Sequence, residues 1–248
     1  MTRSRSIALA LVAIAAIAVG GYVAYDQVLR GDDVATLALP SAAAPSADPT
    51  TEPAATAAAS TEPGTVADMF GEWQIAGDSV AGYRVREQLA NLPAESDAVG
   101  RTSDVTGSIT VEENGKGARL TAGTLTVDTT TITSDESRRD NRLRSEGLQT
   151  DQFPTATFVV TQPVDVPAAA LAGTATDITL VGDLTLHGVT KAVEIPAQTL
   201  LSDGRIQVAG SLTFPLADFD ISAPNVGGFI LSIADKGALE FLVSFEKA

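Results

Sequence analysis

The sequence predicts an all-β domain, either a β-sandwich or a closed barrel. Long segments of the chain alternate between apolar and polar residues, as a strand with one buried face does. Short turns join these segments, and stretches that favour helix are few. The alternation is clearest in four stretches: residues 179–190, 191–198, 206–214 and 239–245.

The chain begins with a candidate membrane segment. Residues 7–25 are uncharged and mostly aliphatic, and about 20 such residues in a helix span a bilayer. Arg3 and Arg5 precede this segment, and basic residues stay on the cytoplasmic side. We therefore predict a single-pass transmembrane signal anchor in the cell membrane, with residues 1–6 in the cytoplasm and the C-terminal domain outside.

A cleaved signal peptide is the alternative for this segment. The apolar region of a signal peptide is usually about 7 to 15 residues long and ends at a small-x-small site. The run here is longer, and its end reads GGYVAYD, which is a poor cleavage site. The uncleaved anchor is therefore favoured.

Residues 26–66 are predicted to form a disordered linker. From Ala35 to about Val66 they are rich in Ala, Pro, Ser, Thr and Glu and contain almost no large apolar residue, so burial cannot offset the entropy of ordering them. The folded domain is expected at residues 67–248, which is enough chain for one core. Because the sequence has no cysteine, this exported domain must be held by its core without disulfides.

The first half of the domain predicts further strands. The segments with strand character are residues 72–77, 80–85, 105–112, 119–133 and 155–161. Asn114-Gly115 predicts a hairpin turn, and the alternation changes phase near Gly123, which predicts a β-bulge. A short apolar helix or turn is expected at residues 166–172.

One segment, residues 134–150, predicts a helix. Ser134 can cap it and Gly147 can end it. Its arginines, the main cationic cluster in a chain of formal net charge −15, are Arg138, Arg139, Arg142 and Arg144. They form either a solvated face that pairs with nearby carboxylates or a docking site for a phosphate or pyrophosphate group. Nucleic-acid binding is not expected at this net charge.

Several positions expected to face inward are small. The inward set mixes glycine and alanine with leucine: Ala122, Gly182, Leu184, Gly210 and Leu212. Small inward residues either leave volume for an apolar ligand or relieve crowding where the sheet bends. The sequence leaves both interpretations open.

Enzyme functions have weaker support. With one histidine and no cysteine, a His- or Cys-rich zinc site cannot be assembled. His187 lies in a predicted turn, where a structural hydrogen bond to the backbone is favoured over catalysis. Asp218 and Asp220 could form a carboxylate pair, but acidic residues are abundant in this chain. We therefore predict a protein that is not an enzyme, with no catalytic residue and no metal site.

Three segments of the domain carry a family signature. The most specific, residues 182–191, reads GDLTLHGVTK at a predicted strand-turn-strand. The others are Trp73-Gln74-Ile75 and the pair Arg139-Asp140 with Phe153-Pro154 downstream. In order and spacing they resemble the YceI-like family of periplasmic or exported lipid-binding proteins, over the chain from Trp73 to the C-terminus.

The resemblance implies a lipocalin-like antiparallel eight-stranded β-barrel with one short helix. Its elongated apolar interior would hold a polyisoprenoid lipid, such as a quinone or an isoprenoid phosphate, with no covalent cofactor. The chain departs from the family pattern at Arg142, where histidine is usual, and at Asp220, where glycine is usual. These departures bear on the identity of the ligand and leave the expected fold unchanged.

We therefore expect a membrane-tethered, extracytoplasmic protein that carries an isoprenoid-type lipid inside its barrel. The residues expected to line the barrel are Trp73, Leu125, Phe158, Leu180, Leu184, Leu186, Leu212, Phe214, Phe241 and Val243. The residues expected at the polar head group are Arg139, Arg142 and His187. The alternatives are a ligand-free adhesion or scaffold domain on a stalk and, with less support, a hydrolase. A continuous internal cavity would separate the first two, because the core of a sandwich is interdigitated and dry.

Overall fold

The computed structural model describes residues 34–39, 69–89, 95–115, 117–222 and 230–248. Its strands are β1 Gly71–Ile75, β2 Val80–Leu89, β3 Glu95–Thr102, β4 Val105–Glu113, β5 Ala118–Asp128, β6 Thr155–Val160, β7 Val164–Val166, β8 Thr176–Leu186, β9 Val189–Ser202, β10 Arg205–Pro215 and β11 Ile230–Lys247. Its helical segments are η2 Thr129–Thr131, α2 Ser137–Arg142, η3 Leu143–Gly147, α3 Ala168–Leu171 and η4 Leu216–Phe219. The prediction of an all-β domain is confirmed.

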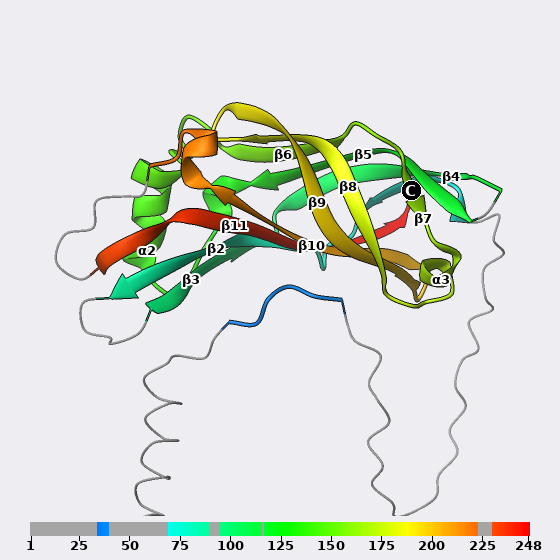
Figure 1. Cartoon of the computed structure of the whole chain (residues 1–248), viewed down its shortest axis with the longest axis horizontal. Coiled ribbons are helices and arrows are strands. Elements are labelled where there is room, and N and C mark those ends of the chain that lie inside the picture. The colour runs from blue at the N-terminus through cyan, green and yellow to red at the C-terminus, as the bar shows by residue number, and fades with distance from the viewer. Residues whose placement is uncertain (1–33, 40–68, 90–94, 116, 223–229) are drawn as a thin grey trace, which may run out of the picture.

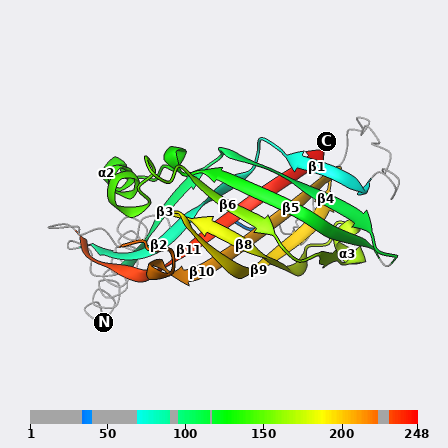
Figure 2. The same cartoon turned by 90° about the horizontal axis from the view of Figure 1, so that it is seen from above.

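Eight antiparallel strands close into a barrel (Figure 1). The hydrogen-bonded order is β1-β4-β5-β6-β8-β9-β10-β11, and β11 returns to β1 to complete the ring. Strand β7 pairs with β5 beside this ring, and β2 and β3 extend the wall from β11. Helices α2 and α3 lie at opposite ends of the long axis (Figure 2). A closed ring leaves few exposed strand edges, and it excludes the sandwich alternative.

Along one edge, strand β11 pairs with two different strands. Its C-terminal part pairs with β1, where Phe245 lies opposite Ile75. Its N-terminal part pairs with β2, where Leu239 lies opposite Tyr83. Strands β1 and β2 therefore lie one after the other beside the same strand, and together they fill one position in the barrel wall. The same is true of β3 and β4, which pair with β2 and β1 respectively.

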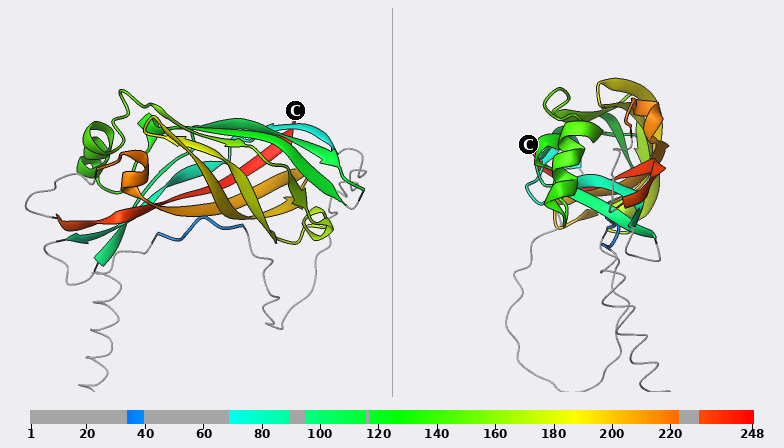
Figure 3. Two further views of the ribbon diagram at one scale, coloured as in Figure 1. Left: turned by 45° about the horizontal axis from the view of Figure 1, so that its top comes forward. Right: turned by 90° about the vertical axis from the view of Figure 1, so that its left-hand side faces the viewer.

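The end of the barrel at β3 is closed by the helical segment and not by a sheet ladder. On the side of β3 away from β2, the described residues provide one isolated bridge, between Arg101 and Thr133. Helix α2 and η3 continue from there across the barrel end, as the right-hand view of Figure 3 shows.

The turn between β8 and β9 confirms the predicted hairpin. His187 has φ 52° and Gly188 has φ 75°, the pair of positive values that a two-residue type I′ turn requires. The Phe153 ring packs against Gly188, where an added Cβ would lie 2.6 Å from the ring. Both the left-handed backbone and this close approach explain glycine at position 188.

Several local predictions need correction. The predicted phase change is real, but the register shift falls where Thr110 and Val111 pair with Ala122 and Leu120. Ala122 is therefore exposed and Gly123 faces inward. The helix is capped by Glu136, whose side chain accepts a hydrogen bond from the Arg138 N–H, and not by Ser134. Strands β3 and β7 were not predicted.

The N-terminal predictions are only partly covered by the structure. Among the described residues, no helix has the length and apolar character needed to cross a bilayer. The predicted anchor at residues 7–25 and the segment 1–6 lie outside the described residues. Within the predicted linker, residues 34–39 are described, and Leu39 is buried against the barrel. These six residues therefore contact the barrel, and the disordered linker stays a prediction.

Candidate ligand-binding cavity

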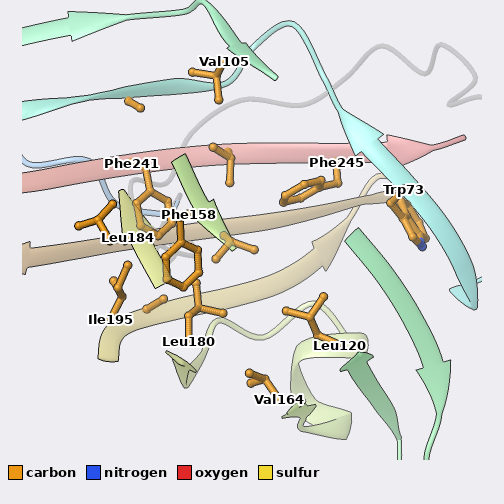
Figure 4. Close-up of a cluster of buried hydrophobic side chains, with 14 of the residues drawn as sticks. Trp73, Val105, Leu120, Phe158, Val164, Leu180, Leu184, Ile195, Phe241 and Phe245 are labelled. Atoms are coloured by element: carbon orange, nitrogen blue, oxygen red, sulfur yellow. The ribbon is translucent and has the colours of Figure 1, made fainter. Parts of the chain in front are cut away.

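The barrel encloses a cavity of about 870 Å³. Alternation along each strand turns every second side chain inward, and these inward side chains are mostly aliphatic or aromatic. Figure 4 shows Phe158, Leu184 and Phe241 pointing into the space that the strands enclose. The cavity is therefore apolar along most of its length.

Most of the predicted lining residues lie on the wall of this cavity. Those that do are Leu125, Phe158, Leu180, Leu184, Leu186, Phe214, Phe241 and Val243. Trp73 and Leu212 do not reach it. Trp73 is buried in the core, where its indole N–H donates to the Met69 carbonyl at 3.0 Å, and Leu212 packs against the core. Contact with a ligand stays a prediction for the eight residues on the wall.

The small inward residues do not create the empty volume. An added Cβ at Gly182 would lie 2.6 Å from the Phe158 ring, and one at Gly210 would lie 2.6 Å from the Phe241 ring. Both glycines thus make room for aromatic rings on the neighbouring strand. Of the two interpretations that the sequence left open, relief of crowding is the correct one at these two positions.

A polar group of three residues, Tyr83, Glu87 and Arg139, lies on the cavity wall at the α2 end. Glu87 is only 3% exposed, and Arg139 Nη2 donates to its Oε1 at 2.6 Å. Arg139 Nη1 also forms an ion pair with Asp135. Burial opposes the charge of Arg139, but the carboxylates of Glu87 and Asp135 outweigh it and raise the pKa of the guanidinium.

Two donors of this group lack a partner. Within the described residues, the Tyr83 hydroxyl and Arg139 Nε are buried and make no hydrogen bond. Burial raises the pKa of Tyr83 to about 12, so its hydroxyl keeps its proton at neutral pH. Buried donors without partners are rare and costly in native proteins. Both atoms are shielded from the cavity by neighbouring atoms, so an oxygen atom of a bound molecule could accept from either only after a side chain moves.

Local hydrogen bonds fix the helix that supplies Arg139. Asp140 is buried and accepts from the Ser134 N–H at 2.9 Å and from the Ser134 hydroxyl at 2.6 Å. The Glu136 cap holds the first turn. Because Glu136 and Asp140 are both fixed, Arg139, which lies between them, is held on the cavity wall.

The other predicted arginine at the head group, Arg142, also lines the cavity. It is half-buried and forms no ion pair with any residue that the structure describes. The predicted local pairing of the helix therefore applies to Arg139 and not to Arg142.

His187, the third predicted head-group residue, does not line the cavity. Its Nδ1 lies 3.1 Å from the Phe219 carbonyl oxygen. Its ring packs edge-on against Phe153, with 4.5 Å between the two ring centroids. This is the structural role in a turn that the sequence favoured over catalysis. Asp218 pairs with Lys191 at 3.2 Å, and neither Asp218 nor Asp220 reaches the cavity. The carboxylate pair considered for a hydrolase is therefore not directed into it.

Tyr83 and Glu87 were not predicted as site residues. The strand predicted at residues 80–85 was too short to include Glu87, whereas β2 continues to residue 89. Alternation from Ala81 places Tyr83 and Glu87 on the inner face, so a longer strand would have put a glutamate inside an apolar barrel. A glutamate on the inner face of an apolar barrel was the signal for a polar site.

Comparison with known proteins agrees with this geometry. A family model for the YceI-like domain matches residues 73–245. A UPF0312 protein of Pseudomonas paraeruginosa is 38% identical over 130 residues, which cover 49% of this chain and 62% of that protein. A UPF0312 protein of Vibrio parahaemolyticus is 34% identical over 113 residues, or 43% of this chain and 56% of that protein. The matched segments thus span little more than half of these relatives.

Two solved structures share the fold. One is a polyisoprenoid binding domain from Saccharophagus degradans, with 20% identity, a TM-score of 0.55, and coverage of 72% of this chain and 99% of that domain. The other is BcnA from Burkholderia cenocepacia, with 16% identity, a TM-score of 0.50, and coverage of 67% and 95%. At these identities the likeness concerns the fold alone. The family model, by contrast, covers most of the chain and nearly the whole barrel, and the chain therefore belongs to the YceI-like family.

Proposed function

We propose that this protein is a non-enzymatic carrier that holds an isoprenoid-type lipid inside its barrel. The observation that carries the proposal is the apolar cavity of about 870 Å³ with unpartnered donors at one end. Small-molecule sites usually have volumes of about 300–1,000 Å³, so the cavity is at the large end of that range. Each buried CH₂ group contributes about 0.8 kcal/mol, and a chain of isoprene units could therefore bind through its tail alone.

The polar end of the cavity indicates what the head group would offer. Tyr83 and Arg139 line this end and carry buried donors that a small side-chain movement would expose, and Arg142 presents a positive charge without a partner among the described residues. Such a site fits a head group of acceptor oxygens, either the carbonyls of a quinone or a phosphate. Arg139 is already compensated by Glu87 and Asp135, so Arg142 is the residue that would favour an anionic head group.

The membrane tether belongs to this proposal. A signal anchor at residues 7–25 would hold the barrel at the outer face of the cell membrane, where lipids with long apolar tails reside. The fold shared with a polyisoprenoid binding domain of Saccharophagus degradans supports the ligand class. A scaffold domain without a ligand would gain nothing from a large internal cavity, because unfilled volume forfeits packing energy.

The test is native mass spectrometry, with lipid extraction, of the full chain purified from membranes of its own host. We expect one isoprenoid lipid per protein in the wild type. Ala156→Phe, which adds a ring at a cavity-lining position of β6, should reduce the adduct at least about tenfold by occupying its volume. Thr155→Phe adds the same ring at the adjacent exposed position and should leave the adduct unchanged.

Two outcomes would contradict the carrier. One is a wild-type protein that is empty after purification and takes up no added isoprenoid. The other is an adduct that both substitutions reduce equally, because a lipid bound on the outer surface would not distinguish the two faces of β6. The identity of an extracted lipid separates a quinone from a phosphate.

A further inference from the structure

A short segment far from β2 and β3 in the sequence lies across the outside of the barrel. Residues 34–39, blue in Figures 1 and 3, run along the outer face formed by β2, β3, β10 and β11. They are separated in sequence from β1 by residues 40–68, and the composition around them predicted no structure. Their placement must therefore come from contacts with the barrel surface.

Charged side chains of the barrel bind the backbone of this segment. Arg84 Nη2 donates to the Val34 carbonyl at 2.7 Å, and Arg101 Nη2 donates to the Ala35 carbonyl at 2.5 Å. Further along, the Leu37 N–H donates to Glu240 Oε2 at 3.1 Å. Arginines of the barrel thus donate to carbonyls of the segment, and a carboxylate of the barrel accepts from an amide of the segment. This pattern recognises an extended chain whatever its side chains are.

An apolar socket holds the end of the segment. Leu39 is 7% exposed and packs against Leu200, Ala209 and Leu242. These three residues form a cluster separate from the main core. An outer face of a barrel is ordinarily polar, so this small patch is explained by the leucine that covers it.

The carboxylate at the centre of this face is unusual for an exterior position. Glu240 alternates on β11 with the inward-facing Leu239 and Phe241, yet it is only 3% exposed. It lies 3.2 Å from Arg84 and 3.6 Å from Arg101. Removing three charges from water is costly. The hydrogen bonds with the segment satisfy Glu240 Oε2 and one Nη2 atom of each arginine, whereas Arg101 Nε has no partner among the described residues.

We propose that the outer face around Arg84, Arg101 and Glu240 is a binding site for residues 34–39 of the same chain, and that this latch sets the length of the membrane tether. The second half of the proposal rests on the signal anchor of the proposed function. With the latch docked, residues 26–33 alone connect the anchor to the barrel surface. With the latch released, residues 26–66 do so.

The two states differ greatly in reach. At about 3.3–3.6 Å per extended residue, residues 26–33 span at most roughly 30 Å and residues 26–66 at most roughly 150 Å. The docked barrel therefore stays close to the bilayer with a fixed side toward it, whereas the released barrel samples a much larger volume. A carrier would load its lipid in the first state and could deliver it at a distance in the second.

Docking is tested by hydrogen exchange on the full-length protein in detergent. Leu39→Asp places a charge in the apolar socket, and we expect exchange at the Leu37 amide to accelerate on the order of tenfold or more. Leu39→Ala should act in the same direction with a smaller factor. Val159→Asp introduces the same charge at an apolar residue of β6 that is 43% exposed and lies outside the latch site, and it should leave the exchange unchanged.

The tether length is tested separately, in vesicles of host lipids. The chain has no cysteine, so Thr213→Cys, at an exposed position of β10, gives a single dye site for energy transfer to an acceptor in the bilayer surface. Transfer should be high in the latched protein, should fall with Leu39→Asp, and should persist with Val159→Asp.

Each result decides one part. Equal exchange at Leu37 in all variants overturns the latch. Protection that grows with protein concentration also overturns it, because the segment would then come from a second copy. Altered exchange with unchanged transfer overturns the role in tether length. A wild type that fails to insert into vesicles contradicts the anchor of the proposed function, whereas the exchange data still decide whether residues 34–39 bind in cis.

Discussion

Two buried glutamates lie on opposite faces of the same part of the barrel wall. Glu87 of β2 faces the cavity and Glu240 of β11 faces outward, and both are 3% exposed. Glu87 is bound by Arg139 from helix α2, whereas Glu240 is bound by Arg84 and Arg101 from neighbouring strands. Each position would be expected to carry an apolar or an exposed residue, so both need an explanation.

The surroundings of the two carboxylates differ in a way that indicates function. On the outer face, residues 34–39 of the same chain cover Glu240 and bind its remaining oxygen, although Arg101 Nε has no partner among the described residues. On the inner face, the Tyr83 hydroxyl and Arg139 Nε have no partner among the described residues, and both residues line the cavity. Both sites therefore keep buried donors without partners. They differ in what adjoins them, which is a segment of the chain on the outer face and a cavity suited to a ligand on the inner face.

The largest effect is expected at the inner pair. Glu87→Leu leaves Arg139 largely buried with only the exposed Asp135 as a partner, and we expect the free energy of unfolding to fall by about 3–4 kcal/mol. The double variant Glu87→Leu with Arg139→Leu should recover most of this loss, because apolar residues fit an apolar wall. Urea denaturation of the wild type, Glu87→Leu, Arg139→Leu and the double variant measures the loss and its recovery. A double variant as unstable as the single would contradict the assignment of the loss to the unpaired guanidinium.

A smaller effect is expected at the outer pair. Glu240→Leu should lower the free energy of unfolding by about 2–3 kcal/mol, because Arg84 keeps Asp97 at 3.0 Å and both arginines gain water when the segment leaves. The same measurement applies, with exchange at Leu37 as a second readout. Arg205→Met is the control, since its pairs with Asp78 and Glu246 are exposed and should contribute less than about 1 kcal/mol. Equal losses at Glu87 and Glu240 would remove the distinction between the faces.

The smallest effect is expected from Tyr83 at high pH. Its pKa is about 12 in the folded protein against an ordinary value of 10.0, so between these values the unfolded chain releases a proton that the folded chain retains. Stability should therefore fall as the pH rises from 10 to 12, by about 1–2 kcal/mol, and this contribution should be intact below pH 10. Comparing unfolding of the wild type with Tyr83→Phe at both pH values isolates it. An identical pH dependence in the two proteins would mean that Tyr83 is not buried.

The sequence predicted the strands well because they repeat one signal, whereas their closure into a barrel was expected only from the family resemblance. Alternation in residues 179–190 and 206–214 fixed which face is buried, and the His187-Gly188 turn fixed the pairing of β8 with β9. These are local patterns, and the structure confirms them. The bulge was found within two residues, because a change of phase shows that a residue is inserted but not which one leaves the ladder.

The candidate site was predicted less completely because it depends on contacts between distant segments. Arg139 and Arg142 were found through their charge, but nothing local linked Arg139 to Glu87, which lies 52 positions away. The interpretation of the small residues depended on which ring lies across the strand pair, as Phe158 does at Gly182. The ordering of residues 34–39 depended entirely on the barrel surface, and a composition rich in alanine and proline gave no sign of it.

The helix at the β3 end is held differently from the paired strands of the barrel wall. Where strands are paired, an opening requires that they separate and lose a series of ladder hydrogen bonds, each worth about 0.5–1.5 kcal/mol net. At the α2 end, the described residues provide one isolated bridge, from Arg101 to Thr133, and side-chain contacts such as that of Arg139 with Glu87 hold the helix. In the carrier proposed above, we therefore expect a lipid to enter at this end, next to an ion pair whose two residues line the cavity.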